Sequence, residues 1–308
     1  MLGRKNKLLL LKIASLFSVV RGYNIPIIVL AQYLSAIFIL APEKPALGVL
    51  LDLNLFLIVL ASSLTIASGY IINNFYDSKK DLINRPNKSM LDRLVSQKTK
   101  LYVYFSLNFI VVFIAFFMSW RAVIFFSVYI FLIWFYSHKV KKYPIIGNLM
   151  SAFMAVLPFF AILMYFKNFY EVIFAHAIFL YLLLLIREMV KDLENITGDL
   201  VNDYRTIPVI FGEKISKQFI TFACIATVFP VYVLIDIFDV GYMDIYFYFC
   251  LISLIFFLLY LWKADTKAQF TKLHNILKFL IVSGVFCIVL INPSVLINGR
   301  NYLMMVHF

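Results

Sequence analysis

Long apolar runs are the feature that most constrains how this chain can fold. A helix needs roughly 20 apolar residues to cross the ~30 Å hydrocarbon layer of a membrane. Nine runs approach that length, and they lie at about 24–41, 53–73, 101–119, 122–137, 146–166, 170–190, 218–238, 243–262 and 276–293. We therefore predict an all-α, polytopic membrane protein with nine transmembrane helices. Residues 7–20 are amphipathic and basic, which is typical of a helix that lies at the membrane interface.

The composition excludes a water-soluble protein of this length. Of the 308 residues, 63% are hydrophobic and only 14% are charged, whereas a soluble domain carries about 25% charged residues. The net charge of +12 lies in short loops between apolar runs, which is typical of membrane topology and gives no reason to expect a nucleic-acid partner. Cys224, Cys250 and Cys287 stand far apart in apolar runs and show neither metal nor disulfide spacing.

The basic residues also predict an orientation. If the N-terminus is cytoplasmic, 24 of the 28 Lys and Arg residues fall on the cytoplasmic side, and the opposite topology would invert that bias. We therefore expect an integral protein of the cell (inner) membrane with a cytoplasmic N-terminus. Residues 1–308 are expected to form one domain, with cytoplasmic active-site loops at about 77–100 and 191–217, the most polar stretches of the chain.

A first cluster of oxygen ligands follows the second apolar run. Asn73, Asp77 and Asp81 are spaced i, i+4, i+8, so a helix places all three on one face. Like charges repel at this spacing unless a cation lies between them. Carboxylate and amide oxygens suit Mg²⁺, which makes these residues candidate metal ligands. The alternative is a helix end that frays into a charged loop.

A second cluster follows the sixth apolar run. Asp192, Asn195 and Asp199 are spaced i, i+3, i+7, which predicts another shared helix face, with Glu188 one turn earlier. Gly198 is expected to loosen or end this helix. An even number of membrane crossings separates the two clusters, so both should emerge on one side. Two Mg²⁺ ions held there could clamp a diphosphate between the clusters.

Basic residues flank both clusters and could pair with phosphate oxygens. Each one taken singly is equally well explained as a topology charge. As a set beside the carboxylates they are candidate substrate-binding residues, namely Arg85, Lys88, Lys141, Lys191 and Arg205.

At these residues the chain resembles the UbiA superfamily of intramembrane prenyltransferases. The first motif of that family, Asn-x-x-x-Asp-x-x-x-Asp, is matched by Asn73, Asp77 and Asp81. Its second motif is matched by Arg187, Glu188, Lys191, Asp192, Gly198 and Asp199, and further likeness lies at Tyr136, Lys141, Arg21 and Asn24. The resemblance implies a Mg²⁺-dependent enzyme of lipid membranes that transfers a prenyl group from a prenyl diphosphate. It also implies catalytic roles for Asp77, Asp81, Asp192 and Asp199, and substrate contacts from Tyr136, Arg21 and Asn24.

The pattern looks most like the geranylgeranylglycerol-phosphate geranylgeranyltransferase branch, which implies a glycerol-phosphate lipid precursor as the acceptor. A quinone-pathway enzyme with an aromatic acceptor is the alternative within the family, and a membrane transporter is the alternative of another class. The chain departs from the family pattern in four places. Asn74 and Asn195 stand where Asp is usual, Asp203 stands where Gly is expected, and residues 89–96 replace the usual loop after the first motif.

Overall fold

The computed structural model describes residues 4–295, and within them it contains helices and no strand. Apolar sequence explains most of these helices, because a backbone in hydrocarbon must satisfy its own hydrogen bonds. Eight helices are long and apolar enough to cross a membrane, within the described part of the chain. The first predicted span corresponds to Ile25–Leu40, which is shorter. The predicted all-α membrane fold is therefore confirmed, whereas the count of nine spans is not.

The chain divides into two compact units made of interleaved segments. Unit 1 comprises residues 1–29, 57–150 and 195–210, and unit 2 comprises residues 30–56, 151–194 and 211–308. The family-like motifs are divided between them, because Asn195 and Asp199 lie in unit 1 while Asp192 lies in unit 2. The two units are therefore described separately.

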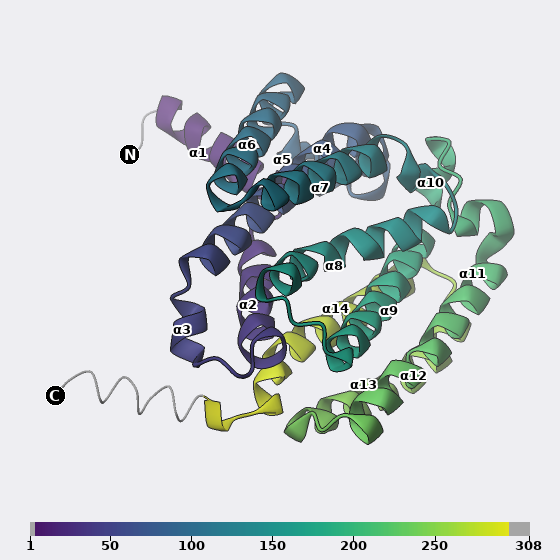
Figure 1. The fold of residues 1–308 in the computed structure, drawn as a ribbon. Helices are drawn as coiled ribbons and strands as arrows, with labels where there is room; N and C mark the ends of the chain where they lie inside the picture. Colours follow the sequence, from purple (N-terminus) through teal and green to yellow (C-terminus); the bar gives the residue numbers. More distant parts are fainter. Residues whose placement is uncertain (1–3, 296–308) are drawn as a thin grey trace. The chain divides into compact units, whose positions relative to one another are not determined.

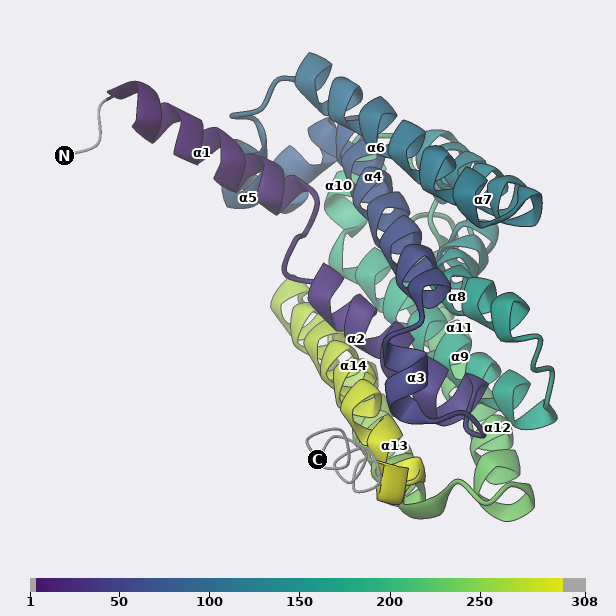
Figure 2. The ribbon, with the colours of Figure 1, turned by 60° about the vertical axis from the view of Figure 1, so that its left-hand side comes forward.

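Unit 1 is built around the long helix α4. Figure 1 shows α6 and α7 running side by side, and Figure 2 shows α1 beside the short helix α5. A buried cluster formed by Val19, Ile71, Ile72 and Tyr104 joins α1, α4 and α6. The helices that lie wholly or largely in this unit are α1 (Arg4–Val19), α4 (Leu53–Asn84), α5 (Pro86–Asp92), α6 (Gln97–Met118), α7 (Trp120–His138), the 3₁₀ turn η2 (Val140–Lys142) and α10 (Ile196–Val201).

Unit 2 is built around the packing of α9 against α14. Its helices are α2 (Ile25–Ser35), the π turn η1 (Ala36–Leu40), α3 (Ala46–Leu50), α8 (Ile146–Phe166), α9 (Glu171–Glu194), α11 (Ile207–Ala226), α12 (Val228–Tyr232), the π turn η3 (Val233–Ile237), the 3₁₀ turn η4 (Gly241–Met243), α13 (Asp244–Lys263), α14 (Lys267–Cys287) and the 3₁₀ turn η5 (Ile288–Ile291). The first turn of α2 and the beginnings of α8 and α11 belong to unit 1.

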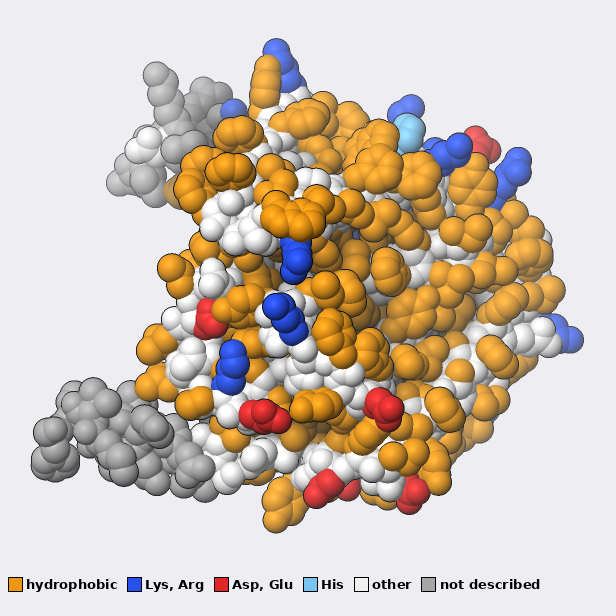
Figure 3. Space-filling view, viewed as in Figure 1, with side chains coloured by type: hydrophobic (Ala, Val, Ile, Leu, Met, Phe, Trp, Pro, Cys, Tyr) orange, Lys and Arg blue, Asp and Glu red, His pale blue; other side chains and the backbone are white. Residues whose placement is uncertain are grey.

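The surface exposes more apolar side chains than a water-soluble protein does. Figure 3 shows hydrophobic side chains over most of the face it draws, with charged groups scattered singly or in small clusters. On α6, Phe109 and Phe116 are 72% and 73% exposed. Exposed apolar surface of this extent marks contact with lipid, so the protein is an integral membrane protein.

Candidate active site

The first motif lies on one uninterrupted helix. Helix α4 continues through Asn84, so Asn73, Asp77 and Asp81 follow one another at one-turn intervals, as the spacing predicts. The ammonium of Lys141 donates to Asp77 Oδ1 at 2.7 Å and to Asn73 Oδ1 at 3.1 Å. Asp77 is 8% exposed and Lys141 is 9% exposed. Two of the three predicted ligands therefore already converge on one buried cation.

The turn η2 brings Lys141 to α4 from between α7 and α8. A close backbone approach at Gly147 allows this, because a Cβ atom there would lie 3.2 Å from the Val140 carbonyl oxygen and 3.3 Å from Lys141 Cα. The Arg205 amide donates to the Lys142 carbonyl at 2.8 Å, which ties η2 to the segment after α10. The side chain of Arg205 is exposed, and the backbone amide of Arg205 is the group that contacts the site.

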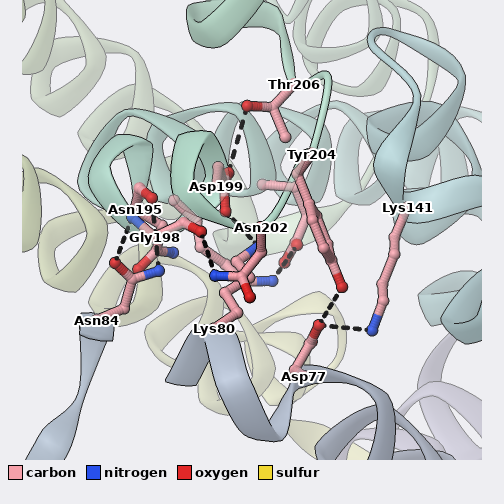
Figure 4. Close-up of polar contacts among 12 residues, drawn as sticks. Asp77, Lys80, Asn84, Lys141, Asn195, Gly198, Asp199, Asn202, Tyr204 and Thr206 are labelled. Carbon is pink, nitrogen blue, oxygen red and sulfur yellow. Dashed lines mark hydrogen bonds and ion pairs between the residues drawn. The ribbon is translucent and has the colours of Figure 1, made fainter. Parts of the chain in front are cut away.

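Asp199 is the second carboxylate of the site, and it is completely buried in α10. Lys80 of α4 pairs with its Oδ1 at 2.5 Å, and the Thr206 hydroxyl donates to its Oδ2 at 3.3 Å (Figure 4). Burial raises the pKa of the Asp199 carboxyl, and the charge and hydrogen bond of Lys80 act in the opposite direction. The charge of Asp77 also acts on Asp199, so the two carboxylates share one electrostatic environment.

Tyr204 links the two lysine–aspartate pairs, and the sequence reasoning did not identify it. Its hydroxyl donates to Asp77 Oδ1 at 2.7 Å (Figure 4). The ammonium groups of Lys80 and Lys142 lie 4.2 Å and 5.3 Å from the centre of its ring. Burial, followed by the charge of Asp77, raises the pKa of Tyr204, so the phenol stays protonated and remains a donor. The sequence contains one signal that could have identified Tyr204, namely its place in the polar segment directly after the second motif.

Asn84, the last residue of α4, fixes where α10 begins. Its side-chain amide donates to the Asn195 carbonyl at 3.4 Å and its carbonyl accepts from the Gly198 amide at 3.1 Å (Figure 4). The second motif is consequently not one helix, because α9 ends at Glu194 and α10 starts at Ile196. The prediction that Asp192, Asn195 and Asp199 share a helix face is therefore wrong.

Gly198 also has a different role from the predicted one. It lies inside α10 and neither loosens nor ends a helix. A Cβ atom at this position would lie 2.3 Å from Asn84 Nδ2, closer than any side chain tolerates. Glycine is needed here because the side chain of Asn84 packs directly against the α10 backbone.

The other predicted residues of unit 1 differ in the contacts that they make. The Asp81 carbonyl accepts from the Arg85 amide at 2.8 Å, and the charged neighbours of its carboxylate include Arg21, Arg85 and Lys88. Lys88 pairs with Asp92 at 2.9 Å instead. The guanidinium of Arg21 lies 5.0 Å from the ring centre of Tyr70, and the two remaining residues, Asn24 before α2 and Tyr136 on α7, are half-buried.

The remaining predicted residues belong to unit 2. Asp192 and Lys191 lie on the last turns of α9 and are half-buried. Lys191 pairs with Glu188 at 2.6 Å, and Arg187 pairs with the same carboxylate at 2.8 Å. Glu188 is 7% exposed, so its buried charge is balanced by neighbours on its own helix.

The oxygen atoms of unit 1 fit Mg²⁺ as partial ligands. No group of three or more His, Cys, Asp or Glu side chains within residues 4–295 is close enough to enclose a metal ion. Mg²⁺ usually takes one or two protein carboxylates and completes its shell with water and substrate phosphates. The convergence of Asn73 and Asp77 on the Lys141 ammonium shows that this oxygen pair already accommodates a cation.

Comparison with known proteins agrees with this architecture. The model of the UbiA prenyltransferase family matches residues 29–293, which includes most of both units. This chain belongs to the UbiA prenyltransferase family.

Individual relatives carry one recurrent name. The digeranylgeranylglyceryl phosphate synthase of Methanobrevibacter smithii is 32% identical over 176 residues, which is 54% of this chain and 61% of that protein. The synthase of the same name from Methanosphaera stadtmanae is 28% identical over 215 residues, which is 69% of this chain and 77% of that protein. The match to the first of these therefore spans less than two thirds of the relative's length.

Solved structures show the same fold. A structure described as digeranylgeranylglyceryl phosphate synthase in membranes superposes with a TM-score of 0.68 at 20% identity, over 91% of this chain and 98% of that one. A UbiA homolog from Archaeoglobus fulgidus bound to GPP and Mg²⁺ superposes with a TM-score of 0.65 at 15% identity, over 89% and 99%. At these identities the likeness establishes the fold alone.

Proposed function

We propose that this protein is a Mg²⁺-dependent prenyltransferase that moves a prenyl group, the geranylgeranyl group first among candidates, from its diphosphate to a glycerol-phosphate lipid precursor. One observation carries the proposal. Asp77 with Asn73 and Asp199 each hold a lysine ammonium, and Tyr204 joins the two pairs within one buried site. The carboxylates are suited to bind Mg²⁺, and the ammonium groups beside them are suited to bind the phosphate oxygens of a diphosphate.

The chain's own residues would exchange partners when the donor binds. Lys141 and Lys80 would turn from the carboxylates to phosphate oxygens, leaving Asn73, Asp77 and Asp199 to coordinate metal. Asp81, Asp192 and Asn195 are the further proposed metal ligands. Bound Mg²⁺ supplies Lewis acidity to the departing diphosphate. Tyr204 would stay on Asp77 and hold that carboxylate in place.

The proposed reaction breaks the C1–O bond of the prenyl diphosphate, and the electron pair leaves with the diphosphate. A bond then forms between C1 and the acceptor hydroxyl oxygen, whose proton passes to the released diphosphate. Arg21, Arg85, Lys88, Lys191 and Arg205 are the proposed additional phosphate contacts, together with Asn24 and Tyr136 as substrate contacts. Before they can contact phosphate, Lys88 would have to break its ion pair with Asp92, and Lys191 would have to break its ion pair with Glu188.

Both units offer apolar space for a prenyl chain. Unit 1 has an open groove of about 510 Å³ between α4, α6 and α7, lined by aromatic side chains that include Tyr76 and Trp134. Unit 2 has a cavity of about 170 Å³ with an almost wholly apolar lining, in which Ser35, His176 and Tyr246 are the polar members. Ligand sites with few polar groups are typical for an apolar substrate.

The names of the relatives support the choice of acceptor. Digeranylgeranylglyceryl phosphate synthases from several archaea are the recurrent match, which favours glycerol phosphate over the aromatic acceptor of a quinone pathway. Membership in a prenyltransferase family sets the transporter alternative aside.

The test is a reconstituted transfer assay. Purified protein would receive prenyl diphosphates of several chain lengths and a panel of glycerol-phosphate and aromatic acceptors, with products identified by mass. We expect a geranylgeranyl ether of the glycerol-phosphate acceptor, loss of turnover in EDTA and its return with Mg²⁺. Turnover with aromatic acceptors alone would contradict the acceptor, and EDTA-resistant turnover would contradict the role of the metal.

Orientation and domain organisation complete the proposal. We propose a cytoplasmic N-terminus and cytoplasmic loops at 77–100 and 191–217, supported by the distribution of Lys and Arg. We also propose that residues 1–308 act as one catalytic domain, supported by a family match that runs through both units. Labelling of single cysteines placed at exposed Asn87 and Lys167 with a membrane-impermeant reagent tests the orientation. Labelling of position 87 from the outside would contradict it.

A further inference from the structure

A second buried polar cluster lies in unit 1, apart from the two lysine–aspartate pairs. It consists of Asp92 at the end of α5, Asn74 on α4 and Lys100 in the first turn of α6, which are 3%, 7% and 1% exposed. A lysine buried to this extent is costly unless its charge is balanced. The arrangement therefore calls for an account beyond helix packing.

The side-chain amide of Asn74 links the charged groups of Lys100 and Asp92 by accepting a hydrogen bond from the first and donating one to the second. The ammonium of Lys100 donates to Asn74 Oδ1 at 2.8 Å, and Asn74 Nδ2 donates to Asp92 Oδ2 at 3.0 Å. The only hydrogen bond of the Lys100 side chain within residues 4–295 thus goes to a neutral oxygen, and its countercharge lies one amide further on. A carboxamide is required at position 74 because it accepts from one side and donates to the other.

Asp92 also ties α5 to its surroundings. Its Oδ1 accepts from the Ser18 hydroxyl of α1 at 2.8 Å, and its Oδ2 accepts from Lys88 at 2.9 Å. A second link to α1 runs from the Ser15 hydroxyl to the Leu91 carbonyl at 2.8 Å. Two other helices, α1 and α4, therefore hold this seven-residue helix through one carboxylate.

The position of α5 matters to the proposed donor site. Lys88 lies on α5 and Arg85 immediately precedes it, and both of their charges act on Asp81. Asn74 is the direct neighbour of Asn73, whose Oδ1 contacts Lys141. A shift of the Asp92 anchor would move two cations relative to the carboxylates of the first motif.

We propose that Asp92, Asn74 and Lys100 form a positioning relay that holds α5 so that Arg85 and Lys88 face the diphosphate of the donor. The three are positioning residues and contact no reacting atom. The inference rests on the proposed function, because it assigns the relay to donor binding by the same site. It predicts an effect on donor affinity, where a purely structural role would lower only the folded fraction.

The test compares a charge removal with a charge relocation. Asp92→Asn deprives Lys100 of its countercharge and weakens the anchor. Asn74→Asp combined with Asp92→Asn moves the carboxylate to α4, next to Lys100, and moves the amide to α5, where it can donate back. This double variant keeps the net charge and the relay but removes the partner of Lys88.

We expect Asp92→Asn to raise KM for geranylgeranyl diphosphate about tenfold, since hydrogen bonds to charged groups are the strong ones, with kcat within about threefold. The double variant should return KM to within about threefold of the wild type. Unchanged KM in Asp92→Asn, or a double variant as impaired as the single one, would overturn the relay. If Asp92→Asn does not fold, Asn74→Ala, which retains both charges, is expected to show the same direction of change in KM, and unchanged KM would overturn the relay equally.

Lys217→Met is the matched control. Lys217 is also a buried lysine, 7% exposed, and it pairs with Glu213 and the Ala264 carbonyl in unit 2. Its loss should lower Tm without changing KM, and an equal rise in KM would show that any buried lysine has this effect and would overturn the relay. Wild-type protein measured in the same assay separates the two proposals. No transfer by the wild type contradicts the proposed function, whereas active wild type with insensitive Asp92→Asn contradicts the relay alone.

Discussion

The two units balance their buried charges in different ways. In unit 1 two of the pairs join distant parts of the chain, since Lys141 meets Asp77 and Lys80 meets Asp199, whereas Lys88 meets Asp92 four residues away. In unit 2 most pairs are local, since Lys191 meets Glu188 three residues away and Lys217 meets Glu213 four residues away. The contact of His274 with Glu194 at 3.5 Å is a long-range pair in the described part of this unit.

This difference separates stability from chemistry. A local pair stays together wherever its helix lies, so it neutralises charge without defining a site. A long-range pair exists only when several elements converge, and breaking it leaves a buried charge without compensation. Substitutions that break the long-range pairs of unit 1 should therefore affect transfer strongly, whereas breaking the local pair of Lys217 and Glu213 in unit 2 should affect stability alone.

The largest effect is expected for Asp77→Asn. The change removes the carboxylate that Lys141 and Tyr204 share and weakens the proposed metal site, so kcat/KM should fall on the order of 10²–10³-fold. Steady-state transfer of labelled geranylgeranyl diphosphate by detergent-purified protein measures it. A retained size-exclusion profile controls for folding. Activity within threefold of the wild type would remove Asp77 from the proposed site.

A smaller loss is expected for Tyr204→Phe. The phenol donates to a carboxylate, and hydrogen bonds to charged groups contribute about 1.5–3 kcal/mol, so kcat/KM should fall on the order of 10- to 100-fold. Tyr165→Phe is the matched variant in unit 2, where the hydroxyl donates at 2.7 Å to Asp52 Oδ2. That variant should lower Tm slightly and leave transfer unchanged. Equal activity of the two variants would contradict the comparison.

Gly198→Ala should mainly reduce stability. The added methyl group would meet Asn84 at 2.3 Å, and overpacking of this kind costs about 1–3 kcal/mol. The contact between α4 and α10 would loosen, and Asp199 would move with it. Gly48→Ala in α3 is the control, because nothing lies within 4 Å of its Cβ position. Thermal unfolding in detergent should show a lower Tm for the first variant and an unchanged or higher Tm for the second.

The smallest effect is expected for Glu213→Gln. Its side chain is 37% exposed, and the pair with Lys217 spans one helical turn. Pairs of this kind contribute about 0.2–1 kcal/mol, and Lys217 keeps its hydrogen bond to the Ala264 carbonyl. Tm and transfer activity, measured side by side, should both stay near wild-type values. A tenfold loss of activity would show that local pairs also shape the site.

Much of the architecture could be predicted from local patterns. Apolar runs located the helices, and the spacing of Asn73, Asp77 and Asp81 correctly predicted one continuous helix face. The same reasoning failed at Asn195, where the spacing predicted a continuous helix and the chain instead breaks. The clamp from Asn84, more than 100 residues earlier, accompanies that break, and no local pattern contains it.

By itself, the sequence determined the membrane class, the helix positions and the residue types that could bind metal and phosphate, because hydrophobicity and helical periodicity are local properties. The tertiary structure decided which lysine meets which carboxylate. It also placed Tyr204 against Asp77 and Lys80 against Asp199, and it paired Lys88 with Asp92. These pairings depend on where helices end and on how closely backbones approach, as at Gly147 and Gly198. Such distances between remote segments arise only when the whole unit packs.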